Sequence, residues 1–330
     1  MNWKGRRVLV TGADGFIGSH LTERLVREGA RVRAFCLYNS QGSTGWLEDS
    51  PPEIRRKIDF RLGDIRDAQF VDVACQGVDL VLHLAALIAI PYSYAAPESY
   101  LETNVRGTLN VLEAVRRHKL ARLVHTSTSE VYGTPRTLPI RETHALSAQS
   151  PYAASKIAAD QLVLSFHRSF GVPATILRPF NTYGPRQSTR AVLPTILTQL
   201  LEGRGLVRLG RLDTRRDLTY VADTVEGFLR AGLSAGIEGE VLQLGTGKAQ
   251  SIRQIFQAAC AALGVRARVV REPRRMRPDP SEVLALRSDP TQARRRLGWR
   301  AQVGLEEGLR RTARWFRSHR DRYGSELFHV

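Results

Sequence analysis

Short apolar segments alternate with longer amphipathic ones through the first half of the chain, and this alternation restricts the fold more than any other feature. A repeated strand–helix pattern predicts a mostly parallel sheet with helices on both faces, an α/β class of fold. Because crossovers in such sheets are right-handed, the carboxyl ends of the strands should share one edge. Strand character is found at residues 7–11, 31–37, 58–62, 80–84, 122–126 and 174–178, and helical spacing at residues 17–28, 99–118 and 151–170.

After Arg178 the alternation becomes irregular, because prolines and glycines interrupt the chain. Helices are expected at residues 195–202 and 222–231, and a strand at residues 240–244 that would rejoin the sheet. The length of the chain allows two unequal parts. We expect a dinucleotide-binding domain over residues 1–179, to which residues 217–247 return, and a smaller C-terminal substrate-binding lobe built from residues 180–216 and 248–330.

A glycine-rich turn, TGADGFIG at residues 11–18, follows the first predicted strand and opens the first predicted helix. Glycines allow a tight turn and a close approach of the backbone to a pyrophosphate, whose charge the helix N-terminus stabilises. A plain tight turn would explain the glycines alone. Their place between a strand and a helix instead predicts a Rossmann-like doubly wound sheet that binds a dinucleotide. The expected contacts are Gly12, Gly15, Phe16, Ile17 and Gly18.

The second strand bears on the choice of dinucleotide. It should end in an acid if the adenosine ribose carries two free hydroxyls, but Cys36 or Leu37 stands at that place. No arginine follows at once to hold a 2′-phosphate, so we expect NAD and leave NADP open. Further cofactor contacts are expected at Asp64, which could instead cap a turn, and at Ile65, Ala85, Ala86 and Asn104.

Two segments that carry chemistry come next. The sequence TSTSEVYG, residues 126–133, contains Thr128, Ser129 and Glu130, and it precedes Tyr152 and Lys156, whose spacing places them on one helix face. A tyrosine hydroxyl has an ordinary pKa of about 10, and a nearby lysine charge favours its ionised form, which would let Tyr152 act as a base. An isolated YxxxK match would be a surface pair. The motifs upstream argue against that interpretation.

Together with LRPFNTYGPR and RRDLTYVAD further along the chain, these motifs resemble the extended short-chain dehydrogenase/reductases that act on nucleotide sugars. The resemblance covers nearly the whole chain. It implies bound NAD, a nucleotide-diphosphate sugar as substrate, and a homodimer formed through the helices at residues 99–118 and 151–170. It also implies that Thr128 binds the sugar near C4, that Tyr152 removes the 4-hydroxyl proton, and that Lys156 tunes Tyr152.

Glu130 separates the reactions of the family that the chain resembles. Its 4-epimerases usually have a small or apolar residue there, whereas dehydratases need an acid–base group at C5 and C6. The pair Ser129–Glu130 resembles that of GDP-mannose dehydratases and implies a 4,6-dehydratase, in which Glu130 serves as base and then as acid. A decarboxylase of the UDP-glucuronate type, a 4-epimerase and a 5,6-dehydratase stay open. A non-catalytic dinucleotide-binding regulator is disfavoured by the intact Thr128, Tyr152 and Lys156.

Other segments, residues 37–40 with 45–47, 90–94, 186–194 and 275–283, resemble the 4,6-dehydratases of legionaminic-acid-type pathways. That resemblance implies a UDP- or GDP-linked N-acetylglucosamine, and we expect the UDP sugar. Arginine suits the diphosphate because its planar fork donates two parallel hydrogen bonds. A surface role is the alternative for Arg277, and lid packing is the alternative for the segment around Tyr92. The expected substrate contacts are Tyr92, Asn181, Arg190, Arg216 and Arg277.

Composition and charge bear on the remaining partners. The net charge is +17, but the basic residues are spread widely without an aromatic platform among them, so we expect solvated helix faces and no nucleic acid. The longest apolar run is too short to span a bilayer and the N-terminus lacks a signal-peptide core, so we expect a cytoplasmic protein without membrane contact. No CxxC pair is present, so we expect no disulfide framework, no metal site, and small buried side chains at Cys36, Cys75 and Cys260.

Overall fold

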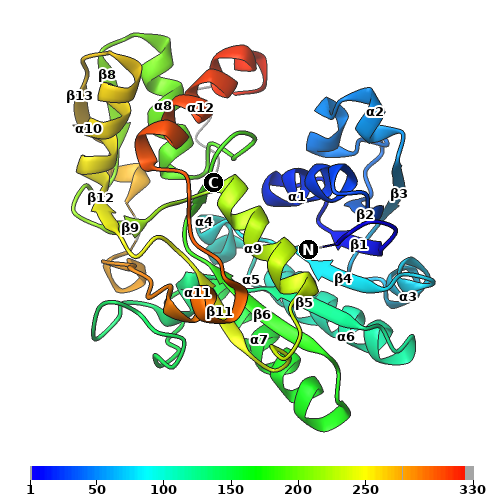
Figure 1. Ribbon diagram of the computed structural model, residues 1–330. Coiled ribbons are helices and arrows are strands. Elements are labelled where there is room, and N and C mark those ends of the chain that lie inside the picture. Colours follow the sequence, from blue (N-terminus) through cyan, green and yellow to red (C-terminus); the bar gives the residue numbers. More distant parts are fainter. Residues whose placement is uncertain (1, 277, 324–330) are drawn as a thin grey trace.

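The computed structural model describes residues 2–276 and 278–323, and Figure 1 shows a central sheet with a second group of elements beside it. The sheet has seven strands in the order β11-β6-β5-β4-β1-β2-β3, and all its pairings are parallel. The predicted doubly wound sheet is therefore confirmed. The strands are β1 (Arg7–Thr11), β2 (Arg31–Leu37), β3 (Ile58–Gly63), β4 (Leu80–His83), β5 (Arg122–Thr126), β6 (Ala174–Pro179) and β11 (Val241–Leu244).

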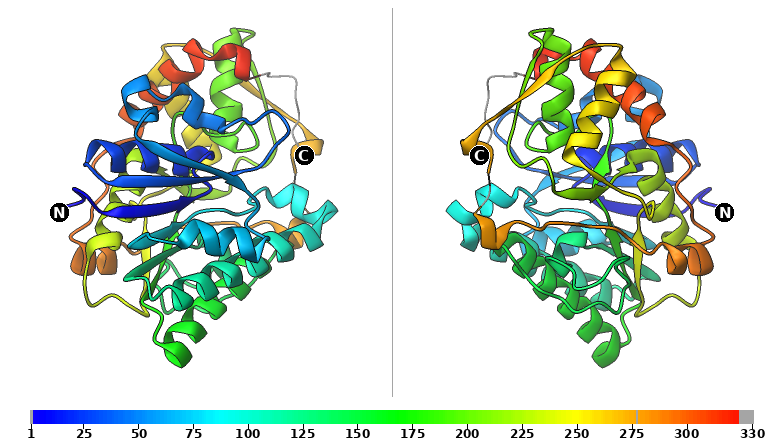
Figure 2. Two further views of the ribbon diagram at one scale, coloured as in Figure 1. Left: turned by 90° about the vertical axis from the view of Figure 1, so that its right-hand side faces the viewer. Right: turned by 90° about the vertical axis from the view of Figure 1, so that its left-hand side faces the viewer.

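Helices cover both faces of this sheet (Figure 2). Successive side chains of a strand point to opposite faces, so Leu9 joins one hydrophobic core while Val8 and Val10 join the other. The first core is closed by α3 (Ala68–Cys75), α6 (Gly107–Arg117) and α7 (Pro151–Phe170), and the second by α1 (Phe16–Arg27), α9 (Val221–Leu233) and α11 (Thr291–Leu297).

The chain is helical over residues 97–117, which confirms the helix predicted for residues 99–118, but the structure adds a π-helical turn that was not predicted. α5 (Pro97–Tyr100) leads into a π-helical turn, η2 (Leu101–Arg106), before α6 begins. The wider turn holds Asn104, which is buried and makes hydrogen bonds across to the neighbouring loop and helix. π-turns of this kind occur often at functional sites.

The second group of elements forms a smaller lobe, in which short strand pairs replace the large sheet. The pairs are β7 (Thr182–Tyr183) with β10 (Thr219–Tyr220), β8 (Leu206–Leu209) with β13 (Arg268–Arg271), and β9 (Arg215–Asp217) with β12 (Ala249–Ser251). Its helices are α8 (Val192–Glu202), α10 (Ile252–Leu263) and α12 (Leu305–Ser318). β11 returns from this part of the chain to pair with β6, as expected for residues 240–244.

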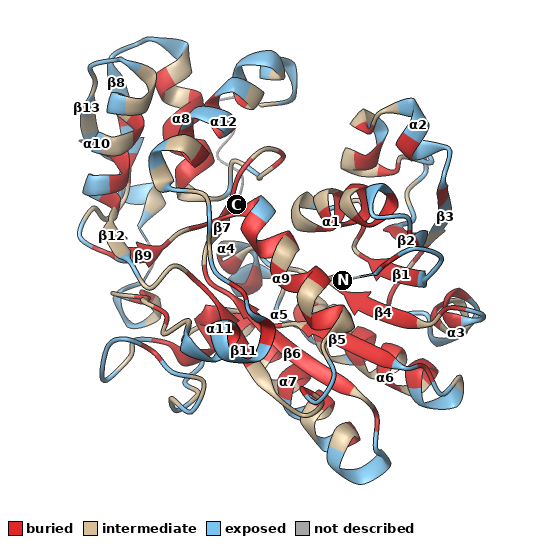
Figure 3. Cartoon of the chain, in the orientation of Figure 1, coloured by how far each residue is buried: buried red, intermediate tan, exposed pale blue. Residues whose placement is uncertain are grey.

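Short helical turns connect these elements. They are η1 (Gly45–Asp49), α2 (Pro52–Arg55), α4 (Ile90–Ala95), η3 (Ser129–Tyr132), η4 (Pro273–Arg275), η5 (Asp279–Ser281) and η6 (Arg320–Arg322). The large sheet and the inner faces of its helices are buried (Figure 3). Cys36 and Cys75 lie in this core. Cys260 is only partly buried, so the expectation of a buried side chain was wrong for it, because the buried face of its helix α10 is formed by other residues, among them Ile255 and Ala259. Within the described residues, no helix combines the length and the apolar character that crossing a membrane requires.

Candidate active site

The catalytic helix α7 begins where its sequence predicts. The Ser150 hydroxyl accepts a hydrogen bond from the backbone N–H of Ala153. Pro151 occupies the first turn, where a backbone N–H would have no partner within the helix, so its missing N–H costs no hydrogen bond. Gly171 ends the helix in the left-handed conformation. This start places Tyr152 in the first turn and Lys156 one turn later, and both side chains are buried.

The end of β5 faces this helix. The chain leaves the strand at Thr126 and makes one helical turn, η3, whose N-cap is Thr128: its hydroxyl accepts a hydrogen bond from the Glu130 N–H at 3.2 Å. The Thr128 side chain also lies close enough to Tyr152 to lower the pKa of the phenol. The predicted residues Thr128, Tyr152 and Lys156 therefore meet at the carboxyl edge of the sheet.

Burial dominates the electrostatics of Tyr152. It raises the pKa of the phenol, Thr128 lowers that pKa, and the charge of Glu130 raises it again. Burial also lowers the pKa of Lys156 to about 8, and Asp160 acts in the opposite direction. The Lys156 Nζ donates one hydrogen bond, to the carbonyl oxygen of Thr126 at 2.6 Å. The sequence predicts an environment that favours the phenolate. The structure shows the opposite balance, because burial penalises the charged phenolate and is the largest effect on this pKa.

Glu130 is buried, with 8% of its surface exposed, and its carboxylate is near enough to Tyr152 for its charge to affect the phenol. Its neighbour Ser129 is buried as well. Gly133 ends the turn with a φ of 58°, a conformation that favours glycine. The site thus combines a hydroxyl base and a carboxylate, two groups that can move protons at adjacent sugar carbons.

A buried polar network, which was not predicted, lies beneath these residues. Asp160 accepts hydrogen bonds from the Ser127 hydroxyl at 2.7 Å and from Arg178 Nη2 at 2.8 Å. Arg178 Nη1 in turn donates to the Tyr132 hydroxyl at 2.8 Å, and so does Gln243 Nε2 at 2.9 Å. A signal was present in the sequence, because Tyr152, Lys156 and Asp160 follow each other at the four-residue spacing of one helix face.

The glycine loop fits a dinucleotide pyrophosphate. Gly12 has a φ of 66°, and a Cβ there would lie 2.8 Å from the Ala85 N. A Cβ on Gly18 would overlap with the Gly12 carbonyl oxygen. Gly15 caps α1 without a side-chain hydrogen bond, and the first turn carries no acid, so its N–H groups are available to an anion. Phe16 and Ile17 begin this helix, and Ala86 follows Ala85 in the loop after β4.

Three other predicted cofactor contacts have protein partners. The Asp64 carboxylate is bonded to Arg66, with Nη2 at 2.5 Å from Oδ2, and this partner lowers its pKa. Ile65 is buried in the core and packs close to Gly107. Asn104 bonds the backbone N–H of Leu87 at 2.8 Å and the Ser155 hydroxyl at 2.9 Å. Asn104 therefore fastens the loop after β4 to α7.

The predicted substrate contacts are spread around the mouth of the site. The Tyr92 ring lies 6.1 Å from that of Tyr100, which is itself 6.1 Å from Tyr152. Tyr100 was not predicted. Burial raises its pKa to about 12, and the charge of Arg190 opposes this, so Arg190 reaches the same neighbourhood. The buried Oδ1 of Asn181 has no hydrogen-bond partner within the described residues.

Arg216 is not open to solvent. It is buried and forms an ion pair with Glu282, with Nη2 at 3.0 Å from Oε1. To bind a diphosphate as predicted, the Arg216 guanidinium would have to leave Glu282 or contact Glu282 and the diphosphate together. The predicted contact Arg277 lies outside the described residues.

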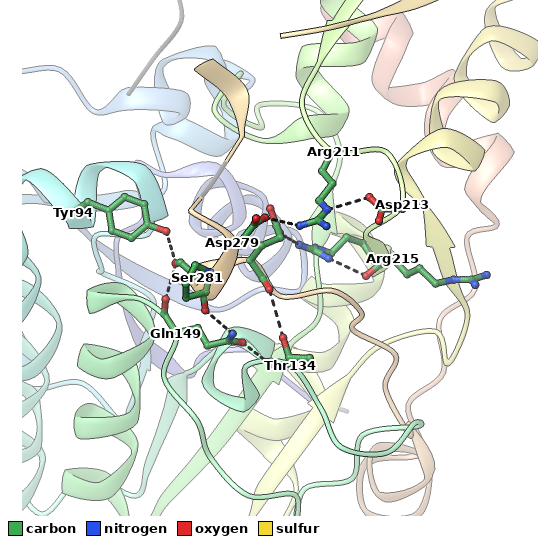
Figure 4. A network of polar contacts seen from close by, with 11 residues as sticks. Tyr94, Thr134, Gln149, Arg211, Asp213, Arg215, Asp279 and Ser281 are labelled. Atoms are coloured by element: carbon green, nitrogen blue, oxygen red, sulfur yellow. Dashed lines mark hydrogen bonds and ion pairs between the residues drawn. The ribbon is translucent and has the colours of Figure 1, made fainter. Parts of the chain in front are cut away.

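A segment that we call the strap, residues 278–284, crosses from the smaller lobe to the active-site loops (Figure 4). Its Ser281 hydroxyl is 2.5 Å from the Tyr94 hydroxyl and donates to the Gln149 carbonyl at 2.6 Å. Gln149 Nε2 donates to the Pro280 carbonyl at 2.8 Å, and Arg211 holds Asp279 from the other side at 2.9 Å. The strap also contributes Val283 to a core with Val131 and Tyr132 of η3. It therefore joins the smaller lobe to the turn that carries Glu130.

Comparisons with known proteins agree with this geometry. Residues 9–312 match the family model described as GDP-mannose 4,6 dehydratase. A UDP-glucose 4-epimerase of Mycolicibacterium smegmatis is 35% identical, over 94% of this chain and 99% of the relative. A dTDP-glucose 4,6-dehydratase of Streptomyces niveus is 32% identical, over 95% of this chain and 94% of the relative.

The similar solved structures are also those of 4,6-dehydratases and 4-epimerases. A double mutant of a dTDP-glucose 4,6-dehydratase from Streptomyces venezuelae, solved with NAD bound, has a TM-score of 0.84 at 32% identity and covers 96% of this chain and 98% of its own. A UDP-glucose 4-epimerase from Thermotoga maritima, solved with UDP-glucose, has a TM-score of 0.85 at 30% identity and covers 94% of this chain and 99% of its own. Similarity alone therefore leaves dehydration and epimerisation side by side.

Proposed function

The chain belongs to the GDP-mannose 4,6-dehydratase family of NAD-dependent nucleotide-sugar dehydratases and epimerases, and from this premise we propose that it is a nucleotide-sugar 4,6-dehydratase. The observation that carries the proposal is the buried carboxylate of Glu130, whose charge reaches Tyr152. Epimerisation needs one base at C4. Dehydration needs a second proton-transfer group at C5 and C6, and we assign that role to Glu130.

Each catalytic residue has one task in this reaction. Thr128 orients the C4 hydroxyl, and Tyr152 accepts its proton while C4 becomes a ketone. NAD, when bound at the glycine loop, supplies the acceptor for the C4 hydride and the donor that returns it to C6. The C4 ketone acidifies the C5 proton, which Glu130 removes. Glu130 then gives this proton to the departing C6 hydroxyl, so one water leaves and a C5=C6 double bond remains. When the hydride is returned to C6, C5 takes up a proton that comes from solvent, and the product is a 4-keto-6-deoxy sugar.

Lys156 supports Tyr152 in this scheme. Its ammonium stabilises the phenolate that forms when Tyr152 deprotonates, and the hydrogen bond to Thr126 holds it in place. One of its three protons is directed to Thr126, so the other two would be available to a bound cofactor. Burial excludes water from this arrangement and strengthens each electrostatic contact.

The proposed substrate is UDP-N-acetylglucosamine, held by the smaller lobe of residues 180–216 and 248–330. Asn181, with its unpartnered Oδ1, and Arg216 are the proposed contacts to the nucleotide diphosphate, with Tyr92 and Arg190 nearer the hexose. A homodimer through α6 and α7 is part of the proposal. Leu101, in the turn η2 directly before α6, and Phe170, at the end of α7, are apolar and each more than half exposed, so both could be covered by a second copy.

A 4-epimerase is the second candidate, and the 35% identity to a UDP-glucose 4-epimerase supports it. The two reactions differ in mass and in isotope uptake. Incubation with UDP-N-acetylglucosamine in deuterated water should give a product that has lost one water and gained deuterium at C5. A product of unchanged mass without C5 deuterium would establish the epimerase, and loss of carbon dioxide from UDP-glucuronate would establish a decarboxylase.

Replacement of Glu130 tests the observation itself. Glu130→Gln keeps the size of the side chain but removes its basicity, so the dehydrated product should fall by a factor on the order of 100 or more while NAD binding is retained. Tyr152→Phe serves as the comparison, because it should abolish oxidation at C4 as well. Undiminished dehydration by Glu130→Gln would exclude the mechanism.

A further inference from the structure

Three consecutive residues at the end of β5 meet three residues spaced by four along α7. Thr126 accepts from Lys156 at 2.6 Å, Ser127 donates to Asp160 at 2.7 Å, and Thr128 interacts with Tyr152. The strand end is thus paired with one face of the catalytic helix. The Ser127–Asp160 pair, which we call the central pair because Ser127 lies between Thr126 and Thr128, contains no catalytic group. On the helix, Asp160 lies one turn beyond Lys156.

The central pair is also the best anchored. Asp160 has no exposed surface, and its Oδ2 is shared by the Ser127 hydroxyl and both Nε and Nη2 of Arg178 on β6. Arg178 continues to the Tyr132 hydroxyl, and Tyr132 is the last residue of the turn that carries Glu130. One carboxylate therefore connects the catalytic helix, two strands of the sheet and the Glu130 turn.

The charges around Asp160 come from each neighbouring element. His125 on β5 lies 3.5 Å from Oδ1, Arg178 projects from β6, and Lys156 stands one turn earlier on α7 itself. Tyr132 on η3 interacts weakly with it. On β4, His83 lies against His125, with ring centroids 5.4 Å apart.

These groups differ in how they respond to Asp160. Burial would raise the pKa of Asp160, but His125, Arg178 and Ser127 lower it below its ordinary value, so it is the carboxylate at neutral pH. Burial lowers the pKa of His83 and of His125, and both are neutral there. Asp160 acts to raise the pKa of Lys156, against the effect of burial.

We propose that Asp160 is a positioning residue for the reaction: its negative charge keeps Lys156 in the ammonium form, and its bonds to Ser127 and Arg178 hold Thr128 and Glu130 in register with Tyr152. The charge and the bonds are separate contributions. The first acts on protonation and the second acts on geometry, so different variants test them.

The charge is tested by titrating Lys156 directly. The sequence contains five lysines, at positions 4, 57, 119, 156 and 248, so lysine-selective ¹³C labelling gives few NMR signals. The signal that disappears in Lys156→Met is that of Lys156. In the NAD-containing protein, Asp160→Asn should lower the titration midpoint of Lys156 by about one pH unit, since an opposite charge nearby has been removed. An unchanged midpoint would overturn this part.

Two companion variants keep that test decisive. Asp160→Asn leaves the Arg178 guanidinium without its partner, so Asp160→Asn/Arg178→Gln removes both charges if the single variant does not fold, and its midpoint should fall in the same direction. Asp223→Asn is the matched control. Asp223 is a buried residue on α9 whose carboxylate accepts a hydrogen bond from the Val303 N–H at 3.0 Å. Its replacement should leave the Lys156 midpoint in place. An equal shift in Asp223→Asn would refute a specific role for Asp160.

The bonds are tested by Ser127→Ala, which leaves the Asp160 charge intact. The Lys156 midpoint should stay in place, while kcat should fall on the order of tenfold with little change in KM, because a small misplacement of catalytic groups slows the chemical step. Restoration by Ser127→Thr, which keeps the hydroxyl, is expected. A kcat equal to that of the parent would overturn the positional part. This readout rests on the proposed function, whereas the titration does not, so a parent protein that fails to dehydrate the sugar would count against the function alone.

Discussion

Lys156 Nζ donates a hydrogen bond to the carbonyl oxygen of Thr126 over 2.6 Å, which joins the catalytic helix to the strand that leads into Thr128. The two residues are 30 positions apart in the sequence and belong to neighbouring elements of one α/β unit. The bond fixes a buried cation beneath the substrate site. Burying a cation is unfavourable, so its presence at this place is a functional feature that lowers stability.

Lys156→Met should stabilise the fold and destroy activity. Burial lowers the pKa of Lys156 from 10.5 to about 8. The resulting stability cost is full below about pH 8 and disappears as the pH rises to the unfolded value of 10.5. Urea unfolding at pH 7 should show a gain on the order of 1–3 kcal/mol that shrinks by pH 10. The exposed Lys248→Met is the control and should change neither stability nor its pH dependence.

The parent enzyme should lose turnover in mild alkali. Its Lys156 ammonium is present below about pH 8 and is lost above that value. In the proposed mechanism this ammonium stabilises the Tyr152 phenolate as it forms, so that support is lost with the charge. A profile of kcat against pH should therefore fall on its alkaline side, provided that the fold persists, which circular dichroism at each pH would establish. A profile that rises steadily to pH 10 would contradict this role of Lys156.

Gly18→Ala should disturb the cofactor loop. The added methyl group would overlap with the Gly12 carbonyl oxygen, so the turn has to shift, at about 1–3 kcal/mol of folding free energy and with weaker binding of NAD. Gly304→Ala is the matched control, because a Cβ at that position meets no atom within 4 Å. Thermal unfolding and titration with NAD would measure both effects. Equal behaviour of the two variants would show that the loop tolerates the methyl group.

Glu23→Gln should weaken the attachment of the smaller lobe. Glu23 on α1 and Arg186, in the loop after β7, form a buried ion pair at 2.6 Å, and removal of one partner of such a pair costs about 3–5 kcal/mol. Burial raises the pKa of Glu23, but Arg186 and Ser50 bring it below 4.5, so the contribution is present above pH 4.5 and is lost in stronger acid. Glu306→Gln, in an exposed pair, should cost less than about 1 kcal/mol in the same urea titration.

Ser281→Ala should loosen the strap of residues 278–284. The change removes the contacts of the Ser281 hydroxyl with Tyr94 and with the Gln149 carbonyl. Two hydrogen bonds of ordinary strength correspond to about 1–3 kcal/mol, so the affinity for the UDP sugar should fall about tenfold or more while that for NAD stays constant. Calorimetric titration with each ligand would separate the two. Equal losses for both ligands would indicate general destabilisation instead.

The sequence by itself determined the sheet and the position of the catalytic pair, because these depend on local patterns. Alternation of strands and helices predicts a parallel sheet, and Ser150, Pro151 and Gly171 set the bounds of α7 through capping and backbone preferences. The glycine loop and the four-residue spacing of Tyr152 and Lys156 are likewise local. Glu130 could be singled out because it lies within a recognisable motif.

Only the tertiary structure decided which distant residues share the site and how their charges are balanced. Asp160 on α7 pairs with Arg178 on β6, and Arg216 pairs with Glu282 of the strap. Asp64 forms an ion pair with Arg66. Burial, which reverses the expected effect on Tyr152, depends on all the elements that close over it. Desolvation and long-range pairing are properties of the packed chain, and no local spacing encodes them.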